Sequence, residues 1–514
     1  MTAIPDTDSR LAWRLVGGLC LLQATLLSVV PWATHLSLPL DVVREGLAWG
    51  REWQWGYHKH PPLPSWIVEL SFRMLGDYGP FLAAQLAVCA TYLFVFLLGR
   101  AMLGPLRAAV GTLLLVGVFY FLWPTPEFNH NLAQMPVWAA VLYCFHRALM
   151  TGALGWWAAL GLCAGVGLLT KYAAIVLLLL VVAYPLLARE TRSIYRSAGP
   201  YVAVALASLV VAPHLAWLVA HDFLPFAHAE ARGGVAPDLW WRIGNPANFL
   251  LAQAIDHLPM VVLLAFGGLI PLSRARAAVP GAPAVAAAPA PADRRFLLVF
   301  GLGPAALAVA LSLAAGIGIR QMWGAPMWNL SGLLAVMWLA RSWPRLRLGR
   351  LAAATFALIA LVAAAYGGRV LYGDRIEGRP GRATWPDREM AARLEALWRE
   401  RTGCPLGIVA GETWLAGLIA MRARSRPSVF LHGDARIAPW ITPGRLAAEG
   451  ALAVWRAEEG RGPPRSLARL PGFSLGGIDL FAWPRLPEAP PLAVGWGIVP
   501  PRAPCAMDPG GTSP

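Results

Sequence analysis

Charged residues are scarce in this 514-residue sequence. Asp, Glu, Lys and Arg make up 14% of it, whereas hydrophobic residues make up 57%. A soluble domain of this length carries far more charge, so the scarcity excludes an ordinary soluble protein. The net charge of +15 does not indicate nucleic-acid binding, because the basic residues fall in short clusters between apolar runs of membrane-spanning length.

Several catalytic patterns are missing as well. The sequence has no P-loop, no HExxH and no glycine-rich dinucleotide fingerprint after a strand, which argues against nucleotide-driven chemistry. Its six cysteines show no CxxC or Cys/His spacing of a metal site. Cys404 and Cys505 lie in the polar C-terminal region, where an oxidising compartment would permit a disulfide between them.

Lysine is nearly absent. Lys59 and Lys171 are the two lysines, and every other residue among the 43 basic ones is arginine. A compact ammonium group and a planar guanidinium group do not replace each other at a close-fitting site. Both lysines are therefore candidates for a functional role.

What the sequence does contain is a series of long apolar runs, which predict an α-helical polytopic membrane protein with about eleven transmembrane helices (a range of 10–13). The arginine clusters fall in alternate loops, which places the N-terminus in the cytoplasm. An Ala/Pro-rich stretch, 277–295, is predicted to be a flexible cytoplasmic linker. The runs lie near 13–33, 80–99, 105–123, 133–150, 154–170, 172–188, 200–220, 248–272, 296–317, 326–341 and 351–371.

The composition changes after the transmembrane domain, 1–371. Residues 372–514 are more polar but keep local patterns: DREMAARLEALWRERTG predicts a helix, and LGIVAG, SVFLHG, ALAVWRAE and GGIDLFAW predict strands. With an odd number of spans, this region is a small extracytoplasmic α/β domain.

The first outer loop, 34–79, contains acidic, basic and aromatic residues. Asp41, Glu45 and Trp49 follow one another at helical spacing, which predicts an amphipathic helix at the membrane surface with an aromatic belt of Trp and Tyr residues. Such a helix serves anchorage alone or forms part of a site. The HKHPPL segment favours a site, because Lys59 stands between two histidines before two prolines that fix the backbone. This arrangement suits a phosphate-bearing lipid headgroup.

The order of residues in this loop resembles that of a known family. Asp41 is followed by Tyr57, Lys59 and His60, and then by Pro61, Pro62, Leu63 and Trp66. This order is similar to that of the family 39 membrane glycosyltransferases of the GT-C superfamily, which include protein O-mannosyltransferases and aminoarabinose transferases of lipid A. The resemblance implies that Asp41 is the catalytic acid of the loop and that Lys59 and His60 lie near the donor phosphate. In some relatives this acid also touches a divalent cation, here Mg or Mn. Val42 departs from the pattern, since many relatives have a second acid there, so any metal would rely on Asp41.

Three further segments supply candidate contacts. Asn129 and Asn131, in WPTPEFNHN beside Glu127 and His130, can hydrogen-bond sugar hydroxyls or a phosphate, although a purely structural role is an equal alternative. Lys171 stands where two short apolar segments meet, as a lysine does in the family, and contacts a lipid phosphate or extends to the interface. Arg320, at the start of a late outer loop, would supply a second cation.

These features together predict a hexosyl- or pentosyltransferase of the bacterial inner membrane. It would move a sugar from a polyprenyl-phosphate donor to a glycolipid, polysaccharide or protein acceptor at the periplasmic face, with Glu45 and Tyr57 among the substrate contacts. Two alternatives stay open. One is a transporter or flippase of a lipid-linked or small substrate, and the other is a protein that binds a lipid-linked sugar without turnover.

Overall fold

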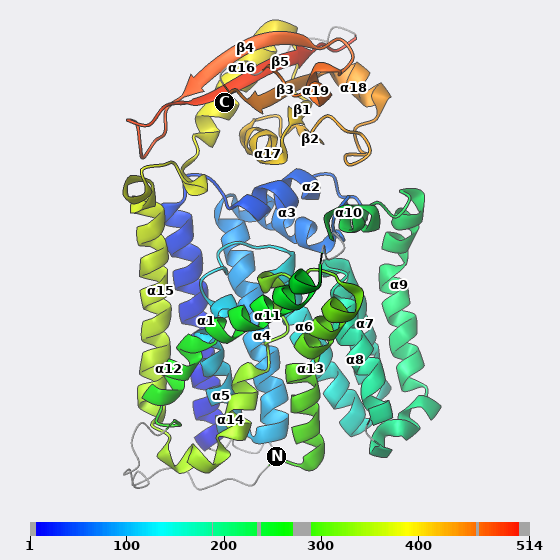
Figure 1. Ribbon diagram of the computed structural model, residues 1–514, viewed down its shortest axis with the longest axis vertical. Coiled ribbons are helices and arrows are strands. Elements are labelled where there is room, and N and C mark those ends of the chain that lie inside the picture. The colour runs from blue at the N-terminus through cyan, green and yellow to red at the C-terminus, as the bar shows by residue number, and fades with distance from the viewer. Residues whose placement is uncertain (1–6, 188, 234–237, 271–288, 459–461, 503–514) are drawn as a thin grey trace. The chain divides into compact units, whose positions relative to one another are not determined.

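A computed structural model describes residues 7–187, 189–233, 238–270, 289–458 and 462–502 (Figure 1). The chain forms two compact units. The helical unit comprises Met1–Val30, Lys59–Leu63 and Phe81–Tyr366, and the α/β unit comprises Pro31–His58, Pro64–Pro80 and Gly367–Pro514. The first outer loop is thereby divided, because Lys59–Leu63 contributes to the helical unit and the flanks of that segment to the α/β unit.

Apolar helices build the helical unit. Within the described ranges, six stretches are long and apolar enough to cross a membrane, or seven if α8 and the bent segment after it form one span. The six are α1 (Thr7–Thr34), α4 (Tyr78–Leu103), α9 (Gly199–Ala220), α11 (Leu239–Asp256) with α12 (Leu258–Phe266), α13 (Pro291–Ala315) and α15 (Leu348–Glu377). The other elements are α5 (Pro105–Leu114), η2 (Leu115–Gly117), η3 (Phe119–Phe121), α6 (His130–Thr151), α7 (Leu154–Thr170), α8 (Ala174–Leu187), η4 (Arg189–Arg196), α10 (Leu224–Gly233), η5 (Gln321–Gly324), α14 (Ser331–Trp338) and η6 (Ala340–Arg345).

The expected eleven spans are therefore not confirmed. In the run near 105–123, the helix α5 ends at Leu114 and gives way to short 3-10 turns. In the run near 326–341, α14 has 8 residues, or about 12 Å of helix, which is too short for a hydrocarbon core about 30 Å thick. Its Leu333 and Leu334 are buried against other helices. Hydrophobicity alone does not distinguish a spanning helix from apolar chain that neighbouring helices cover.

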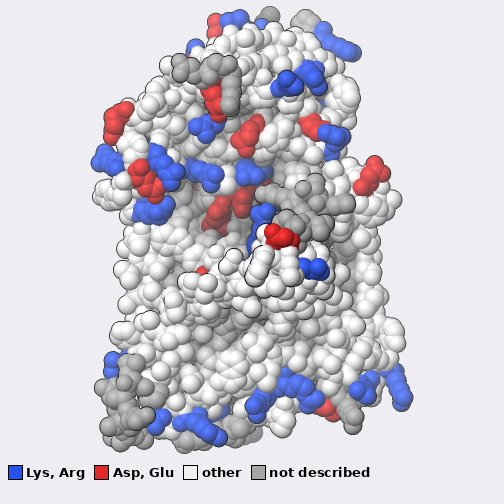
Figure 2. All heavy atoms as spheres, viewed as in Figure 1, with Lys and Arg blue, Asp and Glu red and all other residues white. Residues whose placement is uncertain are grey.

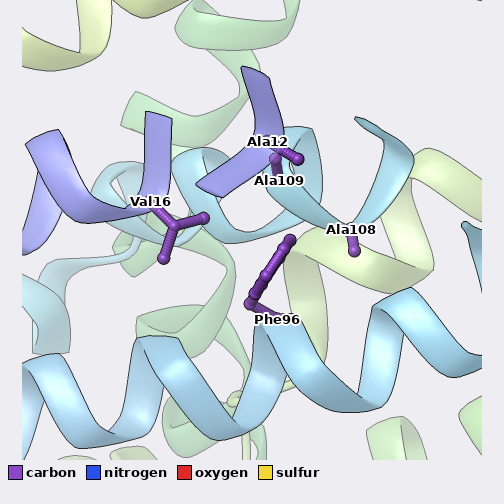
Figure 3. Packing of buried hydrophobic residues seen from close by; sticks show 5 residues of the cluster. All are labelled: Ala12, Val16, Phe96, Ala108 and Ala109. Carbon is purple, nitrogen blue, oxygen red and sulfur yellow. The ribbon is translucent and has the colours of Figure 1, made fainter. Parts of the chain in front are cut away.

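Small residues allow the helices of this unit to pack closely. Ala12 and Val16 of α1 meet Phe96 of α4 and Ala108 and Ala109 of α5 in one buried cluster (Figure 3). Similarly, α7 packs along α6 and α9. At Gly161 of α7 a β-carbon would collide with the backbone of Ala203 in α9. Close approach of backbones through small residues is how helices associate in a membrane, where burial of apolar surface gives little driving force.

Positive charge gathers at one end of the helical unit. Figure 2 shows Lys and Arg along its lower end, whereas the band above is almost free of charged side chains on this face. Ion pairs join loops that the sequence assigns to the same side: Arg295 pairs with Glu190, and His146 Nε2 lies 3.2 Å from Asp293 Oδ1. The arginine-rich loops thus meet as the charge pattern predicts. Of the predicted linker 277–295, residues up to 288 lie outside the described residues, and Pro291 already begins α13.

The α/β unit contains a five-stranded sheet in the order β2-β1-β3-β5-β4. Strand β1 pairs in parallel with β2 and β3, and β5 pairs antiparallel with β3 and β4. The predicted helix and four strands are present, and β5 is a further strand that its flanking prolines and internal glycines obscure in the sequence. The elements are α16 (Asp387–Thr402), β1 (Ile408–Gly411), α17 (Thr413–Arg422), β2 (Ser428–Leu431), α18 (Pro443–Glu449), β3 (Ala451–Arg456), α19 (Arg465–Ala468), β4 (Ser474–Phe481) and β5 (Leu492–Val499), with η7 (Arg382–Thr384) before them.

The flanks of the first outer loop pack into this same unit. They form the π-helix η1 (Val42–Leu47), the short helix α2 (Ala48–Gly50) and helix α3 (Leu63–Leu75). Backbone N–H groups of Leu36 and Ser37 donate to the carbonyl oxygen of Ala383 at 2.9 and 3.0 Å. Cys404 is disulfide-bonded, and Cys505, its expected partner, lies outside the described residues.

Candidate active site

Asp41 stands at the start of the π-helix η1, as its N-cap residue, and is half-buried. Glu45 lies one turn further along η1 and is 5% exposed. The backbone carbonyl of Glu45 accepts a hydrogen bond of 2.6 Å from the hydroxyl of Ser65 in α3. A π-helix has i→i+5 hydrogen bonds in place of the i→i+4 bonds of an α-helix, and such turns are rare and occur frequently at functional sites. The segment that carries the predicted catalytic acid is therefore irregular and held in place.

The predicted surface helix differs from the structure. The helical segment ends at Gly50, and Trp49 is buried, so Asp41, Glu45 and Trp49 do not form one face of an exposed amphipathic helix. Tyr57 is also buried, and its ring stacks on Trp49 at 5.3 Å between centroids. Burial raises the pKa of the Tyr57 phenol well above its usual range. Trp49 and Tyr57 therefore belong to the core of the α/β unit. Burying these two large rings in a core removes more apolar area from water than placing them at the membrane surface would.

Lys59 and His60 belong to the helical unit, and both are half-buried. The imidazole of His60 lies against that of His130, with ring centroids 4.1 Å apart. His130 is the first residue of α6 and is 3% exposed. The structure thus brings the HKHPPL segment together with the second outer loop, WPTPEFNHN (123–131). The sequence does not reveal this contact.

Asn129 and Asn131 have distinct places at the start of α6. Asn129 is the N-cap residue, and its Oδ1 accepts hydrogen bonds from the backbone N–H groups of Asn131 and Leu132. This interaction is a structural role, typical of asparagine at a helix start. Asn131 Oδ1 accepts a hydrogen bond of 2.6 Å from Lys171 Nζ. Of the two asparagines, Asn131 is therefore the one joined to a candidate cation.

Lys171 lies where α7 ends and before α8 begins, as the sequence predicts. Its ammonium also lies 5.7 Å above the ring of Trp323 in η5, within the range of a cation–π interaction. Arg320 caps the same turn η5 and is exposed. Lys171, Asn131 and Trp323 thus form one cluster, which we call the lysine cluster, at the start of a 22-residue helix whose dipole favours an anion there.

A buried polar network lies beside η5, and the sequence does not make it evident. Asp256, at the end of α11, is 5% exposed and accepts hydrogen bonds of 3.0 and 3.1 Å from the amide of Gln321. The hydroxyl of Tyr120 donates to the carbonyl oxygen of Gln321 at 2.7 Å, and Gln253 Oε1 accepts from Trp328 Nε1 at 2.7 Å. The available signal was an acid within the apolar run 248–272, since ionisable residues in such runs mark functional sites.

A cavity of about 460 Å³ opens beside this network. Its walls are mainly apolar side chains of α11, α12, α13 and α14, and its polar groups are Gln253, His257, Trp328 and Ser331. His257 Nε2 lies 2.9 Å from the hydroxyl of Ser331. An apolar cavity with a few polar groups at one side is the usual form of a site for a ligand with a long apolar part.

Binding of a divalent cation, Mg or Mn, by Asp41 stays a prediction. His60 and His130 offer two imidazoles, which zinc accepts as ligands, whereas Mg and Mn prefer oxygen. In the α/β unit, Asp41 is followed by Val42 and so gains no second carboxylate from its neighbour. The residues within the helical unit therefore fit a transition metal better than Mg.

The fold and these clusters define a class: a multi-pass α-helical membrane protein with an α/β unit, whose helical unit gathers a lysine, a histidine pair and an apolar cavity. Residues 59–217 match the family model described as dolichyl-phosphate-mannose-protein mannosyltransferase. Among solved structures, the chain is similar to ArnT from Cupriavidus metallidurans bound to undecaprenyl phosphate, with 15% identity, a TM-score of 0.59 and coverage of 94% of this chain and 97% of that one. The apo structure of the same ArnT gives the same identity and TM-score.

No curated protein matches the chain by sequence. The family-model match covers Lys59–Leu63, the second outer loop and Lys171, and the structural match extends over nearly the whole chain. The chain therefore has the same fold as ArnT. This result confirms the resemblance to the family 39 membrane glycosyltransferases that the first outer loop indicated.

Proposed function

We propose that the protein transfers a sugar from a polyprenyl-phosphate donor to an acceptor at the periplasmic face of the bacterial inner membrane. The observation that carries the proposal is the lysine cluster: the hydrogen bond from Lys171 to Asn131 and the contact with Trp323 hold an ammonium at the positive end of α6. Three N–H donors on one ammonium can serve both Asn131 and a phosphate oxygen. The similar ArnT structure contains undecaprenyl phosphate, which supports a ligand of this chemistry.

In the proposed reaction, the carboxylate of Asp41 takes the proton of the acceptor hydroxyl. The acceptor oxygen then bonds to the anomeric carbon while the bond from that carbon to the phosphate oxygen breaks. Polyprenyl phosphate leaves, and Lys171, Lys59 and His60 stabilise the charge that develops on it. Trp323 offers a ring face to the sugar, and Arg320 adds a second cation at the start of the same turn. A divalent cation, if bound, would lower the charge on the leaving phosphate.

The gathering of arginines at one end of the helical unit supports the orientation within the membrane. Short loops rich in arginine stay in the cytoplasm, so the opposite end, where α6 begins, would face the periplasm. The C-terminus would then be periplasmic and the N-terminus cytoplasmic.

The test measures release of polyprenyl phosphate by purified protein in lipid nanodiscs, supplied with a panel of polyprenyl-phosphate sugars and a membrane extract. We expect release by the unmodified protein and loss of release in Asp41→Asn, Lys59→Arg and Lys171→Met. Arg393→Ala is the matched control, since that side chain is 53% exposed and pairs with Asp479 in the sheet. Release that persists in all three variants would refute the assigned roles.

Transport or flipping is the second candidate, and the observation that favours it is Asp256 within a helix of spanning length. Intramembrane acids are common in transporters. Consumption of no donor in the nanodisc assay, together with movement of a labelled polyprenyl-phosphate sugar across liposome membranes, would select this function. Donor binding without release in the unmodified protein would instead identify a binding protein.

A further inference from the structure

The C-terminal domain, residues 372–514, is bound to the first outer loop by partly buried ion pairs within the α/β unit. Arg426, which precedes β2, donates hydrogen bonds of 2.9 and 2.8 Å from one guanidinium nitrogen to the two carboxylate oxygens of Glu69. Glu69 lies in α3, and its side chain is fully buried. The guanidinium also lies 4.7 Å above the ring of Phe72. A second pair joins Arg422 to Asp77, just after α3, at 2.6 Å.

Helix α3 in turn supports the π-helix with Asp41 and Glu45. One helical turn before Glu69, Ser65 donates to the carbonyl oxygen of Glu45. Gly50 presses against the backbone of Ser65 so closely that a β-carbon there would collide with it. An arginine contact made by the C-terminal domain is thus one turn of helix away from the residues that fix the π-helix.

The other side of the π-helix rests on α17, which belongs to the C-terminal domain. Val43 packs against Gly417, where a β-carbon would lie 2.9 Å from the valine side chain. The hydroxyl of Ser428 in β2 interacts with the carboxyl of Glu52, and burial raises the pKa of that carboxyl. The loop segment 41–52 is therefore enclosed between α3 on one side and α17 and β2 on the other.

Buried ion pairs of this kind contribute little net stability, since desolvation offsets the Coulomb attraction. Their value lies in geometry, because one guanidinium nitrogen of Arg426 contacts both carboxylate oxygens of Glu69 while the guanidinium lies over the ring of Phe72. A lysine ammonium does not reproduce this arrangement. If the ion pair served stability alone, apolar side chains of similar volume could take its place without loss of stability.

We propose that the C-terminal domain is the positioning element of the first outer loop, and that Arg426 and Glu69 are the positioning residues that fix the π-helix carrying Asp41. The expected fall in kcat rests on the proposed function. The expected change in the structure of the first outer loop does not depend on it. Neither residue is assigned a contact with substrate. They act through α3, so their loss displaces the catalytic acid while leaving the lysine cluster in the helical unit unchanged.

The experiment compares Arg426→Ala, Arg426→Lys and Glu69→Gln with the unmodified protein in full-length form, in nanodiscs. Hydrogen exchange of the backbone amides of residues 42–50 is one readout, and kcat and KM for release of polyprenyl phosphate, per folded protein, are the other. We expect Arg426→Ala to speed exchange in 42–50 by about tenfold or more, while the amides of β1 exchange as before. A displaced reacting group costs about a hundredfold in rate, so kcat should fall with KM for the donor unchanged.

Arg426→Lys keeps the charge but loses the planar guanidinium that lies over Phe72, and it should give intermediate values in both readouts. Arg393→Ala, which removes an exposed arginine of the same domain, should change neither. Unchanged exchange of 42–50 in Arg426→Ala, or a fall in kcat matched by general loss of protection across β1, would overturn the positioning role. If the unmodified protein releases no donor phosphate, the proposed function fails, and the exchange measurement still decides whether Arg426 holds the loop.

Discussion

The most quantitative consequence of the structure concerns Arg422, whose side chain is 9% exposed. Its guanidinium donates to Asp387 Oδ2 at 3.0 Å and to Asp77 Oδ1 at 2.6 Å. The Asp387 side chain is 2% exposed, so Arg422→Ala leaves a buried carboxylate without its cation. Asp77 is 23% exposed and keeps Arg388, so its contribution is small. The change in unfolding free energy therefore comes mainly from Asp387.

The size of that change has a ceiling, because the carboxyl can take up a proton instead of staying charged. Proton uptake costs about 1.4 kcal/mol for each pH unit above the pKa in the unfolded chain, and the usual pKa of this carboxyl is 3.8. The ceiling is thus about 4 kcal/mol at pH 7 and about 1.6 kcal/mol at pH 5. Breaking a buried pair costs about 3–5 kcal/mol in general. Because burial already raises the pKa of Asp387 in the unmodified protein, Arg422→Ala should lose less than about 4 kcal/mol at pH 7.

The sign of the pH dependence follows from burial, which raises the pKa of Asp387 in the folded protein even beside Arg422. Because the pKa of Asp387 is higher in the folded protein than in the unfolded chain, its contribution to stability is fully present below pH 3.8. That contribution is lost as the pH rises through the pKa of the folded protein. Removing Arg422 raises the folded pKa further, so the loss extends towards neutral pH. The deficit of the variant should therefore shrink on acidification.

Hydrogen exchange of the amides of β1 and β2 reports the opening free energy of the α/β unit at pH 7 and pH 5. The control is Arg393→Ala, which removes an exposed ion pair and should cost less than about 1 kcal/mol. Arg422→Ala combined with Asp387→Asn should recover much of the loss. A deficit of equal size at the two pH values would refute the assignment to an uncompensated Asp387.

Four other outcomes are expected. Asn129→Ala should cost about 1 kcal/mol of stability by removing the cap of α6, whereas Asn129→Asp should keep it, as thermal unfolding would show. Asp256→Leu should impair donor release more than Asp256→Asn, which keeps an acceptor for Gln321; equal rates would exclude a role for that hydrogen bond. If chelation stops turnover, zinc should restore it better than magnesium, and His130→Ala should weaken zinc binding measured by calorimetry. Burial lowers the pKa of His35 to about 4, so stability should fall by at most about 3 kcal/mol from pH 6.5 to pH 4, and His35→Gln should flatten that fall.

Much of the fold was predictable because apolar periodicity is local. The C-terminal helix and four strands lie where their patterns indicate, and so does the step at Lys171 between two helices. The number of spans was not predictable in the same way, since α14 is as apolar as a spanning helix but is covered by other helices. Burial by neighbours is a property of tertiary structure and leaves no distinct mark on one segment.

The residues of the candidate site were likewise predictable only in part. The scarcity of lysine singled out Lys59 and Lys171, and the first outer loop gave the family resemblance. The same sequence could not show that Asn129 is a helix cap while Asn131 meets Lys171, because both asparagines fit either role. It also gave no sign that His60 lies against His130, a contact between residues far apart in the chain.

The sequence by itself determined that this is a multi-pass membrane protein with a glycosyltransferase-like first loop, because composition, charge clusters and motif order are carried by neighbouring residues. The tertiary structure alone decided which side chains meet. It joined Lys171 to Asn131 and Trp323, and it bound Glu69 to Arg426. The physical reason is that ion pairs and close packing depend on the path of the whole chain, which brings together residues that 40 positions (Asn131 and Lys171) or 357 positions (Glu69 and Arg426) separate.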